Sequence, residues 1–159
     1  MMRRKIKNVF TKQDYNCFAC SPHNPVGLQL SFVETEEGVE SVWNPKQCYE
    51  GYPGVIHGGI LATLTDEVAA WTLYVKGQCS GVTSRLNVKY AKPVSSQQQQ
   101  IVVKGKMREI KRSLAFIDVQ IISENGELCL SGEAVYFVIP REKAVSMNYF
   151  PERFEDFFD

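Results

Sequence analysis

Alternating apolar and polar residues predict two short strands ahead of a long helix. Residues 28–33 alternate as a strand does, and a turn at 36–38 leads into a second, less regular strand at 39–43. Prolines and glycines punctuate residues 44–54, which predicts a loop, and the pattern becomes helical over about 57–76. We therefore expect a hairpin, a loop and one long helix, in that order.

After the helix, the hydrophobic period changes to two, which predicts four further strands. Their expected ranges are 81–90, 101–110, 113–122 and 127–139. The first is expected to be half-buried, with Thr83 on its polar face and Val82 on its apolar face. Asn125-Gly126 predicts a two-residue hairpin loop, because both positions tolerate positive φ. This order of elements indicates an α+β fold with a single long helix on one antiparallel sheet of about five to six strands.

The carboxyl-terminal tail carries phenylalanines at helical spacing among acidic residues, which predicts a short amphipathic helix that docks on the sheet. These are Phe150, Phe154, Phe157 and Phe158. The sequence has no internal repeat and no linker-like stretch. We expect one domain over 1–159, with 1–27 as an amino-terminal segment and 140–159 as the tail.

Composition narrows the class of protein. The chain has 159 residues, 44% of them hydrophobic, and its 18 basic and 18 acidic residues cancel to zero net charge. Balanced charge argues against nucleic acid as the main partner, since phosphate neutralisation needs a surplus of Lys and Arg. No apolar run is long enough for a membrane span or a signal peptide, and five cysteines, an odd number, suit free thiols. We expect a cytoplasmic protein that binds no membrane.

The predicted helix is apolar nearly all round. One sector of about 80° holds a stripe expected to pack on the sheet. The stripe consists of His57, Leu61, Leu64, Val68, Trp71 and Val75, and the opposite side holds Ala62, Asp66, Ala69, Ala70 and Leu73. A helix with two apolar sides needs a second packing partner besides its own sheet, and the simplest candidate for that partner is another subunit.

Asp66 is the residue that least suits its surroundings, because a carboxylate among small apolar side chains is costly to desolvate. One interpretation is a general base or nucleophile in a cleft; the other is a surface aspartate on a helix face that meets water. Glu67 lies about 100° further round the helix. We interpret it as a solvated or hydrogen-bonded neighbour.

His57-Gly58-Gly59 opens the helix, where the first N–H groups have no intrahelical partner and carry the positive end of the helix dipole. Such groups suit an oxygen that develops negative charge. The glycines could equally make a tight loop-to-helix junction. His57 and Asp66 are about 13.5 Å apart along the helix axis, a span comparable to an acyl thioester.

The stretch from Tyr52 to Glu67, which contains Val55-Ile56-His57-Gly58-Gly59, together with Gly81 to Val94, resembles the hotdog-fold acyl-CoA thioesterases of the phenylacetate-pathway type. The opening segment from Cys17 to Leu28 is also similar to one branch of that superfamily. The resemblance covers roughly 17–139. It implies a long helix wrapped by an antiparallel sheet and a homodimer, or a dimer of dimers, with each site across the subunit interface.

The same resemblance assigns roles to individual residues. It implies that the Gly58 N–H polarises the thioester carbonyl, that Asp66 activates water or attacks directly, and that Thr83 positions the nucleophile. It gives His57 the task of supporting the carbonyl-binding loop. Several relatives carry Asn or Gln six residues before the histidine, where this chain has Gly51, so slow hydrolysis or a substitute donor is expected.

Basic residues gather in 85–112, which holds eight of the 18 Lys and Arg residues of the chain. They are suited to the phosphates of coenzyme A, or else they serve as solvated charges that protect a sheet edge. The substrate-binding candidates are Gly59, Glu67, Arg85, Lys92, Lys111 and Arg112.

Cys17, Cys20 and His23 follow a spacing that invites a zinc interpretation. A closed structural site needs a fourth ligand, which only Cys48 or His57 could supply from elsewhere, so packing in a bend is the default and we expect no metal or cofactor. The leading hypothesis for function is an acyl-CoA thioesterase. The alternatives are a non-catalytic acyl-CoA-binding or sensing protein and a hotdog dehydratase, which would need a catalytic histidine.

Overall fold

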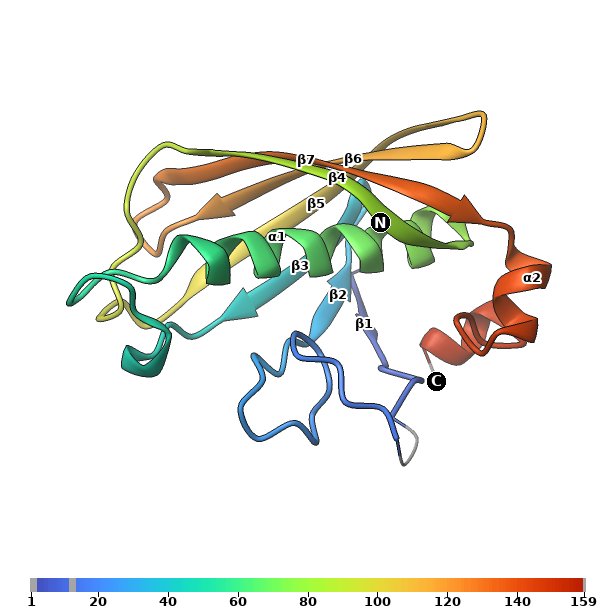
Figure 1. Cartoon of the computed structure of the whole chain (residues 1–159), viewed down its shortest axis with the longest axis horizontal. Coiled ribbons are helices and arrows are strands. Elements are labelled where there is room, and N and C mark those ends of the chain that lie inside the picture. The colour runs from blue at the N-terminus through green and yellow to red at the C-terminus, as the bar shows by residue number, and fades with distance from the viewer. Residues whose placement is uncertain (1–2, 12–13, 159) are drawn as a thin grey trace.

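The structure is a computed structural model that describes residues 3–11 and 14–158. Seven antiparallel strands form one sheet in the order β1-β2-β3-β5-β6-β7-β4. The strands are β1 Arg4–Ile6, β2 Phe32–Glu34, β3 Gly38–Trp43, β4 Ser80–Tyr90, β5 Ile101–Lys111, β6 Leu114–Ile122 and β7 Leu128–Ile139. The helix α1 Gly58–Thr72 lies along one face of this sheet (Figure 1) and ends in a π-helical turn, Leu73–Gly77. The predicted α+β hotdog architecture is therefore confirmed.

Two predictions about strands are wrong in detail. The sheet has seven strands instead of five or six, because the short β1 of the amino-terminal segment adds to its edge. The strand expected at 28–33 begins only at Phe32. Leu28 and Leu30 instead donate their N–H groups to the carbonyls of Phe18 and Ala19, at 2.8 and 2.9 Å. The amino-terminal segment thus takes the place of a strand partner there.

The hairpin between β6 and β7 also differs from its prediction. Only Gly126 has a positive φ, of 83°, whereas both central residues were expected to have one. The Ser123 N–H donates to the Glu127 carbonyl, and the Gly126 N–H donates back to the Ser123 carbonyl. The connection is therefore a three-residue loop, in which one left-handed position suffices.

The core lies between α1 and the sheet, as the helix stripe predicts. Leu61, Leu64, Val68, Trp71 and Val75 are all buried, whereas His57 is exposed at the start of the helix. On the opposite side, Ala69 and Leu73 are also buried within this one chain. The argument that a second subunit must cover these two residues is therefore wrong.

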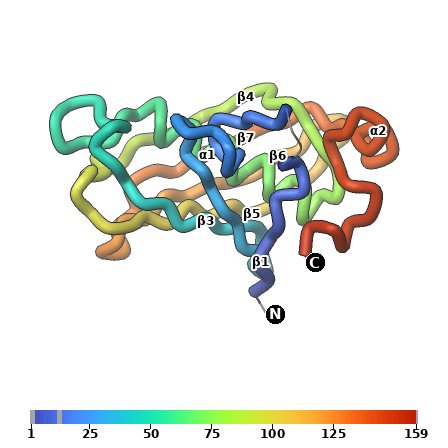
Figure 2. Tube along the Cα trace, turned by 90° about the horizontal axis from the view of Figure 1, so that it is seen from below, coloured from blue at the N-terminus to red at the C-terminus, as the bar shows by residue number. Residues whose placement is uncertain are grey.

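The amino-terminal segment covers the part of α1 that carries Glu67 and Trp71. Figure 2 shows it, in blue, passing over α1 on the side away from the sheet. The Phe10 ring meets the Trp71 ring edge-on with centroids 5.9 Å apart, and Cys17 contacts Glu67. The helix is apolar nearly all round because the chain folds back over it.

The tail was expected to dock on the sheet, but it packs beside the amino-terminal segment instead. It forms a short helix, α2 Arg141–Ser146, and a single 3-10 turn, Phe154–Phe157. Phe157 is fully buried against Trp71, and its carbonyl accepts a hydrogen bond from the Lys7 N–H at 2.7 Å. The segment that follows β1 and the tail therefore lie side by side next to Trp71, near the end of α1.

Candidate functional site

The start of α1 leaves one backbone donor free. His57 is the N-cap, and its Nδ1 accepts a hydrogen bond from the Gly59 N–H at 2.8 Å. The His57 carbonyl accepts from the N–H groups of Ile60 and Leu61. In the part of the chain that the structure describes, the Gly58 N–H alone has no partner in this first turn. The predicted carbonyl-binding donor is available at Gly58, whereas the Gly59 N–H is already used by His57.

Tyr90 of β4 fixes the Gly58 peptide from the other side, because its hydroxyl donates to the Gly58 carbonyl at 2.7 Å. No pattern in the sequence singles out this tyrosine. Position 51 also belongs to this region. A Cβ on Gly51 would lie 3.4 Å from both the Cα and the Cδ2 of His57, so a side chain there would stand against the histidine ring.

Asp66 is half-buried and held by two hydroxyl groups. Thr83 Oγ1 donates to Asp66 Oδ1 at 3.0 Å. The Tyr136 hydroxyl lies 2.7 Å from the same Oδ1 and 2.6 Å from the Asp66 carbonyl, so its single proton serves one acceptor at a time. No lysine, arginine or histidine in the described ranges pairs with this carboxylate. The predicted contact between Asp66 and Thr83 is thus present in the structure.

Tyr136 of β7 was not among the predicted site residues. Burial, and then the negative charge of Asp66, raise the pKa of Tyr136 well above its usual range. The hydroxyl therefore stays protonated and keeps its capacity to donate. A buried tyrosine normally finds a partner for its hydroxyl, and that rule was the one signal in the sequence that could have pointed to it.

Glu67 is the next residue, but its surroundings are different. Its Oε1 accepts hydrogen bonds from Trp71 Nε1 at 3.1 Å and from Cys17 Sγ at 3.6 Å. Burial, and then the neighbouring Cys17, raise the pKa of Glu67 to about 7. It is therefore a hydrogen-bonded neighbour, one of the two alternatives that the sequence left open for it.

A cavity of about 1320 Å³ opens between the amino-terminal segment, α1 and the tail. Glu67 and Cys17 line it together with aromatic side chains, whereas Asp66 and Thr83 do not. The aromatic lining consists of Phe10, Tyr15, Tyr74, Tyr149 and Phe150. The candidate catalytic carboxylate therefore does not face this cavity, whereas the neighbouring Glu67 does.

The Cys17, Cys20 and His23 spacing that invited a zinc interpretation is only partly assembled in space. Cys17 and Cys20 lie together, but His23 and Cys48 are exposed and do not join them. The third group beside the two thiols is Glu67. Cys17, Cys20 and Glu67 are thus the residues with the right ligand atoms for a metal ion, and a search for cysteine and histidine alone misses the glutamate.

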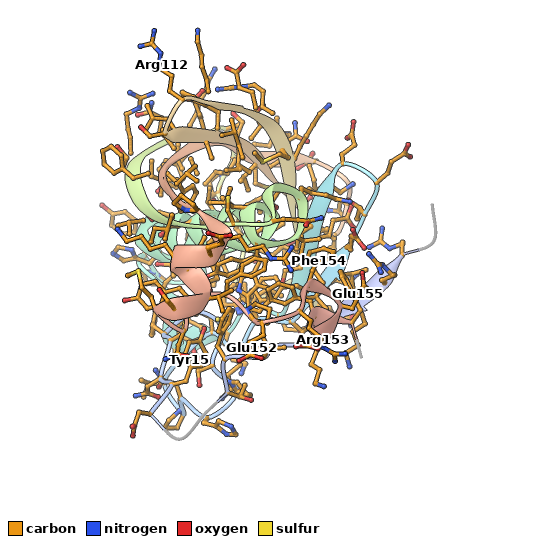
Figure 3. All side chains as sticks on the ribbon, turned by 90° about the vertical axis from the view of Figure 1, so that its right-hand side faces the viewer. Tyr15, Arg112, Glu152, Arg153, Phe154 and Glu155 are labelled. Carbon is orange, nitrogen blue, oxygen red and sulfur yellow. The ribbon has the colours of Figure 1, made fainter. Side chains whose placement is uncertain are left out.

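Most basic residues of 85–112 are paired with acids across the sheet. Arg85 contacts Glu133 at 3.3 Å, and Lys92 contacts Glu127 at 3.1 Å. Lys111 and the neighbouring Arg112 make no ion pair with a described residue. Figure 3 shows Arg112 extending outward at the top of the view, away from Tyr15 and the tail residues Glu152 and Arg153. Lys89 of β4 likewise has no ion pair with a described residue, so the unpaired cations of this stretch are Lys89, Lys111 and Arg112.

None of the helices in the described ranges has the length and apolar character needed to cross a membrane.

Comparison with known proteins agrees with this architecture. Residues 53–130 match the model of a family described as the thioesterase superfamily. Among curated proteins, the chain is 24% identical over 85 residues to a protein of Thermoplasma acidophilum that carries the name "Putative esterase Ta0293". That alignment covers 53% of this chain and 63% of the relative, so less than two-thirds of the relative is represented.

Solved structures extend the likeness over most of the chain. A thioesterase-superfamily protein superposes with a TM-score of 0.69 at 22% identity, over 75% of this chain and 58% of its own. The zebra fish thioesterase superfamily member 2 gives 0.65 at 23% identity, over 76% and 90%. A hypothetical thioesterase of Streptococcus pneumoniae, solved with coenzyme A, gives 0.64 at 23% identity, over 70% and 86%. Alanine variants of that last protein, one at an aspartate and one at a threonine, have also been solved.

Proposed function

We propose that this chain, whose residues 53–130 match the model of the thioesterase superfamily, hydrolyses the thioester bond of acyl-CoA substrates, with Asp66 as general base or nucleophile. The observation that carries this proposal is the Asp66 carboxylate, half-buried, without a basic partner among described residues and oriented by Thr83 and Tyr136. A carboxylate held in this way remains able to accept a proton from water or to attack a carbonyl carbon. The alanine variants of the S. pneumoniae protein alter the same two residue types, aspartate and threonine.

Hydrolysis needs two things from the protein, a base and a donor for the oxyanion. In the water route, Asp66 takes a proton from a water molecule while the water oxygen bonds to the thioester carbon. In the direct route, an Asp66 oxygen bonds to that carbon and the resulting anhydride is then hydrolysed. In both, the carbonyl oxygen becomes negative against the Gly58 N–H, and the C–S bond breaks to release the thiol of coenzyme A.

The two groups cannot meet on one carbonyl within a single chain. Gly58 and Asp66 are eight residues apart on α1, which separates them by about 12 Å along the helix axis. A shared site therefore takes Gly58 from one copy of the chain and Asp66 from another. The edge strand β4, which carries Thr83 and Tyr90, exposes Val82 at 56% and is long enough to pair with its counterpart in a homodimer.

Coenzyme A is the proposed carrier of the acyl group. The structure of the S. pneumoniae relative with coenzyme A supports this assignment. Lys111 and Arg112 are cations available for its phosphates, since they make no ion pair with a described residue, whereas Arg85 and Lys92 are already paired with acids. We assign the acyl part to a small or medium acyl or aryl group.

The direct test is a panel of acyl-CoA and aryl-CoA thioesters, assayed by release of the free thiol. Hydrolysis of at least one member at a rate above the spontaneous reaction supports the enzyme. A protein that binds these thioesters in calorimetry but hydrolyses none would instead be the non-catalytic acyl-CoA-binding protein, an alternative that the missing side chain at Gly51 keeps open. The dehydratase alternative lacks a histidine base beside Asp66, because His57 caps the far end of the helix.

Mixed dimers test the shared site. Asp66→Asn and Gly58→Pro chains are each expected to be inactive alone, but a mixed dimer has one intact site that takes Asp66 from one chain and Gly58 from the other. Random mixing should recover about a quarter of the wild-type rate, since about half of the dimers are mixed and each has one working site. No recovery, or a monomer in sedimentation, would show that the site does not span two chains.

A further inference from the structure

Three metal-ligating atoms converge on the side of α1 away from Asp66. They come from Cys17 and Cys20 in the amino-terminal segment and from Glu67 on the helix, and all lie within 4.8 Å of one another. The two sulfur atoms are 3.2 Å apart, and Cys17 Sγ is 3.6 Å from Glu67 Oε1. The cluster joins segments that are fifty residues apart in sequence, so the fold, and not local spacing, assembles it.

The cluster contains groups that carry negative charge but no cation. The donors around it are neutral: the Cys20 backbone N–H reaches Cys17 Sγ at 3.3 Å, and Trp71 Nε1 reaches Glu67. The Tyr15 hydroxyl lies 2.9 Å from Cys20 Sγ. No Lys, Arg or His of the described residues contacts any of the three ligand atoms. A half-buried carboxylate beside two thiols is costly to keep ionised unless a cation neutralises it.

We propose that Cys17, Cys20 and Glu67 bind a zinc ion with one coordination position left for a water molecule from the cavity. Tetrahedral zinc places two thiolate sulfurs about 3.8 Å apart and a sulfur about 3.5 Å from a carboxylate oxygen. The observed separations of 3.2 and 3.6 Å need only small side-chain shifts to meet these values. Thiolate ligands select zinc over magnesium or calcium.

The cavity gives the ion an entry path. Cys17 and Glu67 both line it, whereas Cys20 lies behind them and is buried. The backbone N–H bond to Cys17 Sγ orients that ligand, as outer hydrogen bonds do in metal sites. Bound zinc would tie the amino-terminal segment to α1 at the residue next to Asp66, and so hold the segment over the helix.

A second chemistry open to the thiols is a disulfide. Its formation would join the two sulfurs and pass two electrons and two protons to an oxidant such as hydrogen peroxide. A disulfide would not involve the neighbouring Glu67, whereas a metal site uses Cys17, Cys20 and Glu67 together. The glutamate therefore favours zinc.

Cobalt substitution tests the site without any assay of hydrolysis. The reduced full-length chain is stripped with a chelator and titrated with Co²⁺. One equivalent should produce the sulfur-to-cobalt charge-transfer band and the intense visible bands of a tetrahedral site, and zinc should displace it. Cys17→Ser and Cys20→Ser should each weaken the charge-transfer band, the double variant should abolish it, and Glu67→Gln should weaken cobalt binding at least about tenfold. Cys48→Ser and Cys129→Ser are the matched controls and should leave the spectrum unchanged.

Three results would overturn the proposal. The first is a wild-type protein that takes up cobalt without sulfur bands. The second is a charge-transfer band that is as strong in the Cys17→Ser and Cys20→Ser variants as in the wild type. The third is a Cys17–Cys20 disulfide, found by mass spectrometry, in protein purified without reductant and without zinc. If a variant does not fold, removal and restoration of zinc in the wild-type chain, followed by elemental analysis, decides alone. Because the experiment measures metal binding and not hydrolysis, its result does not depend on whether the thioesterase proposal is correct.

Discussion

Asp66 and Glu67 are consecutive residues on one helix, yet they lie in two different regions of the molecule. Asp66 points toward β4 and β7, where hydroxyl groups of Thr83 and Tyr136 donate to it. Glu67 points toward the amino-terminal segment, where an indole and a thiol are its partners. A step of about 100° on a helix suffices to change every neighbour of a carboxylate.

The difference between the two regions separates their chemistry. Two donors stabilise charge on Asp66 and leave its second oxygen without a described partner, so this carboxylate suits proton transfer or attack. Glu67 lies beside the two thiols of Cys17 and Cys20, so this carboxylate suits a bound cation. Four predictions test whether this division holds.

The largest effect is expected for Asp66→Asn, which removes the base or nucleophile and preserves the shape of the side chain. The rate of thioester hydrolysis should fall about 10² to 10⁴-fold, with acyl-CoA binding retained in calorimetry. The matched control is Asp118→Asn, an exposed aspartate of β6 that pairs with Arg108, and it should hydrolyse at the wild-type rate. An Asp66→Asn protein with normal kcat would remove Asp66 from the mechanism.

Gly58→Pro deletes one N–H and little else. Proline suits the first position of a helix, and His57 before it already has φ −58° and ψ 133°, the extended conformation that proline requires of its predecessor. We expect kcat to fall about 10² to 10³-fold through loss of an oxyanion donor. Gly58→Ala keeps the N–H, and its Cβ would meet the Tyr90 ring at an ordinary 3.4 Å, so it should retain most of the activity.

If Gly58→Ala and Gly58→Pro lose activity equally, the free N–H is not the oxyanion donor. Unfolding curves of both variants provide the check that neither effect comes from a damaged helix start.

Tyr136→Phe and Thr83→Ala each remove one donor from Asp66. A hydrogen bond to a charged group is worth about 1.5 to 3 kcal/mol, so each should lower kcat about tenfold to a hundredfold. Because the pKa of Tyr136 lies well above its usual range, the ratio of the wild-type to the Tyr136→Phe rate should stay constant from about pH 6 to pH 9. A ratio that changes across this interval would mean that Tyr136 itself exchanges a proton in the reaction.

The sequence predicted one of the two regions far better than the other. The positions of Gly58, Asp66 and Thr83 follow from helix and strand periods, which are local properties. The contact of Glu67 with Cys17 depends on how residues 3–11 and 14–30 cross the helix, and no local pattern specifies that path. Ala69 and Leu73 illustrate the same limitation of local patterns. Their apolar character predicts burial, but it does not predict which part of the chain buries them.

The smallest effect on hydrolysis is expected for Glu67→Gln, and it decides whether the two regions are truly separate. Its side chain lies on the far side of the helix from Thr83, so kcat/KM should change less than about tenfold in zinc-free protein, against the much larger loss in Asp66→Asn. The measurement is repeated with zinc added to both proteins. The difference between the zinc-free and the zinc-loaded wild type then shows how much of any change is caused by loss of the ion. Equal damage from both substitutions, with or without zinc, would mean that the neighbouring carboxylates act as one unit.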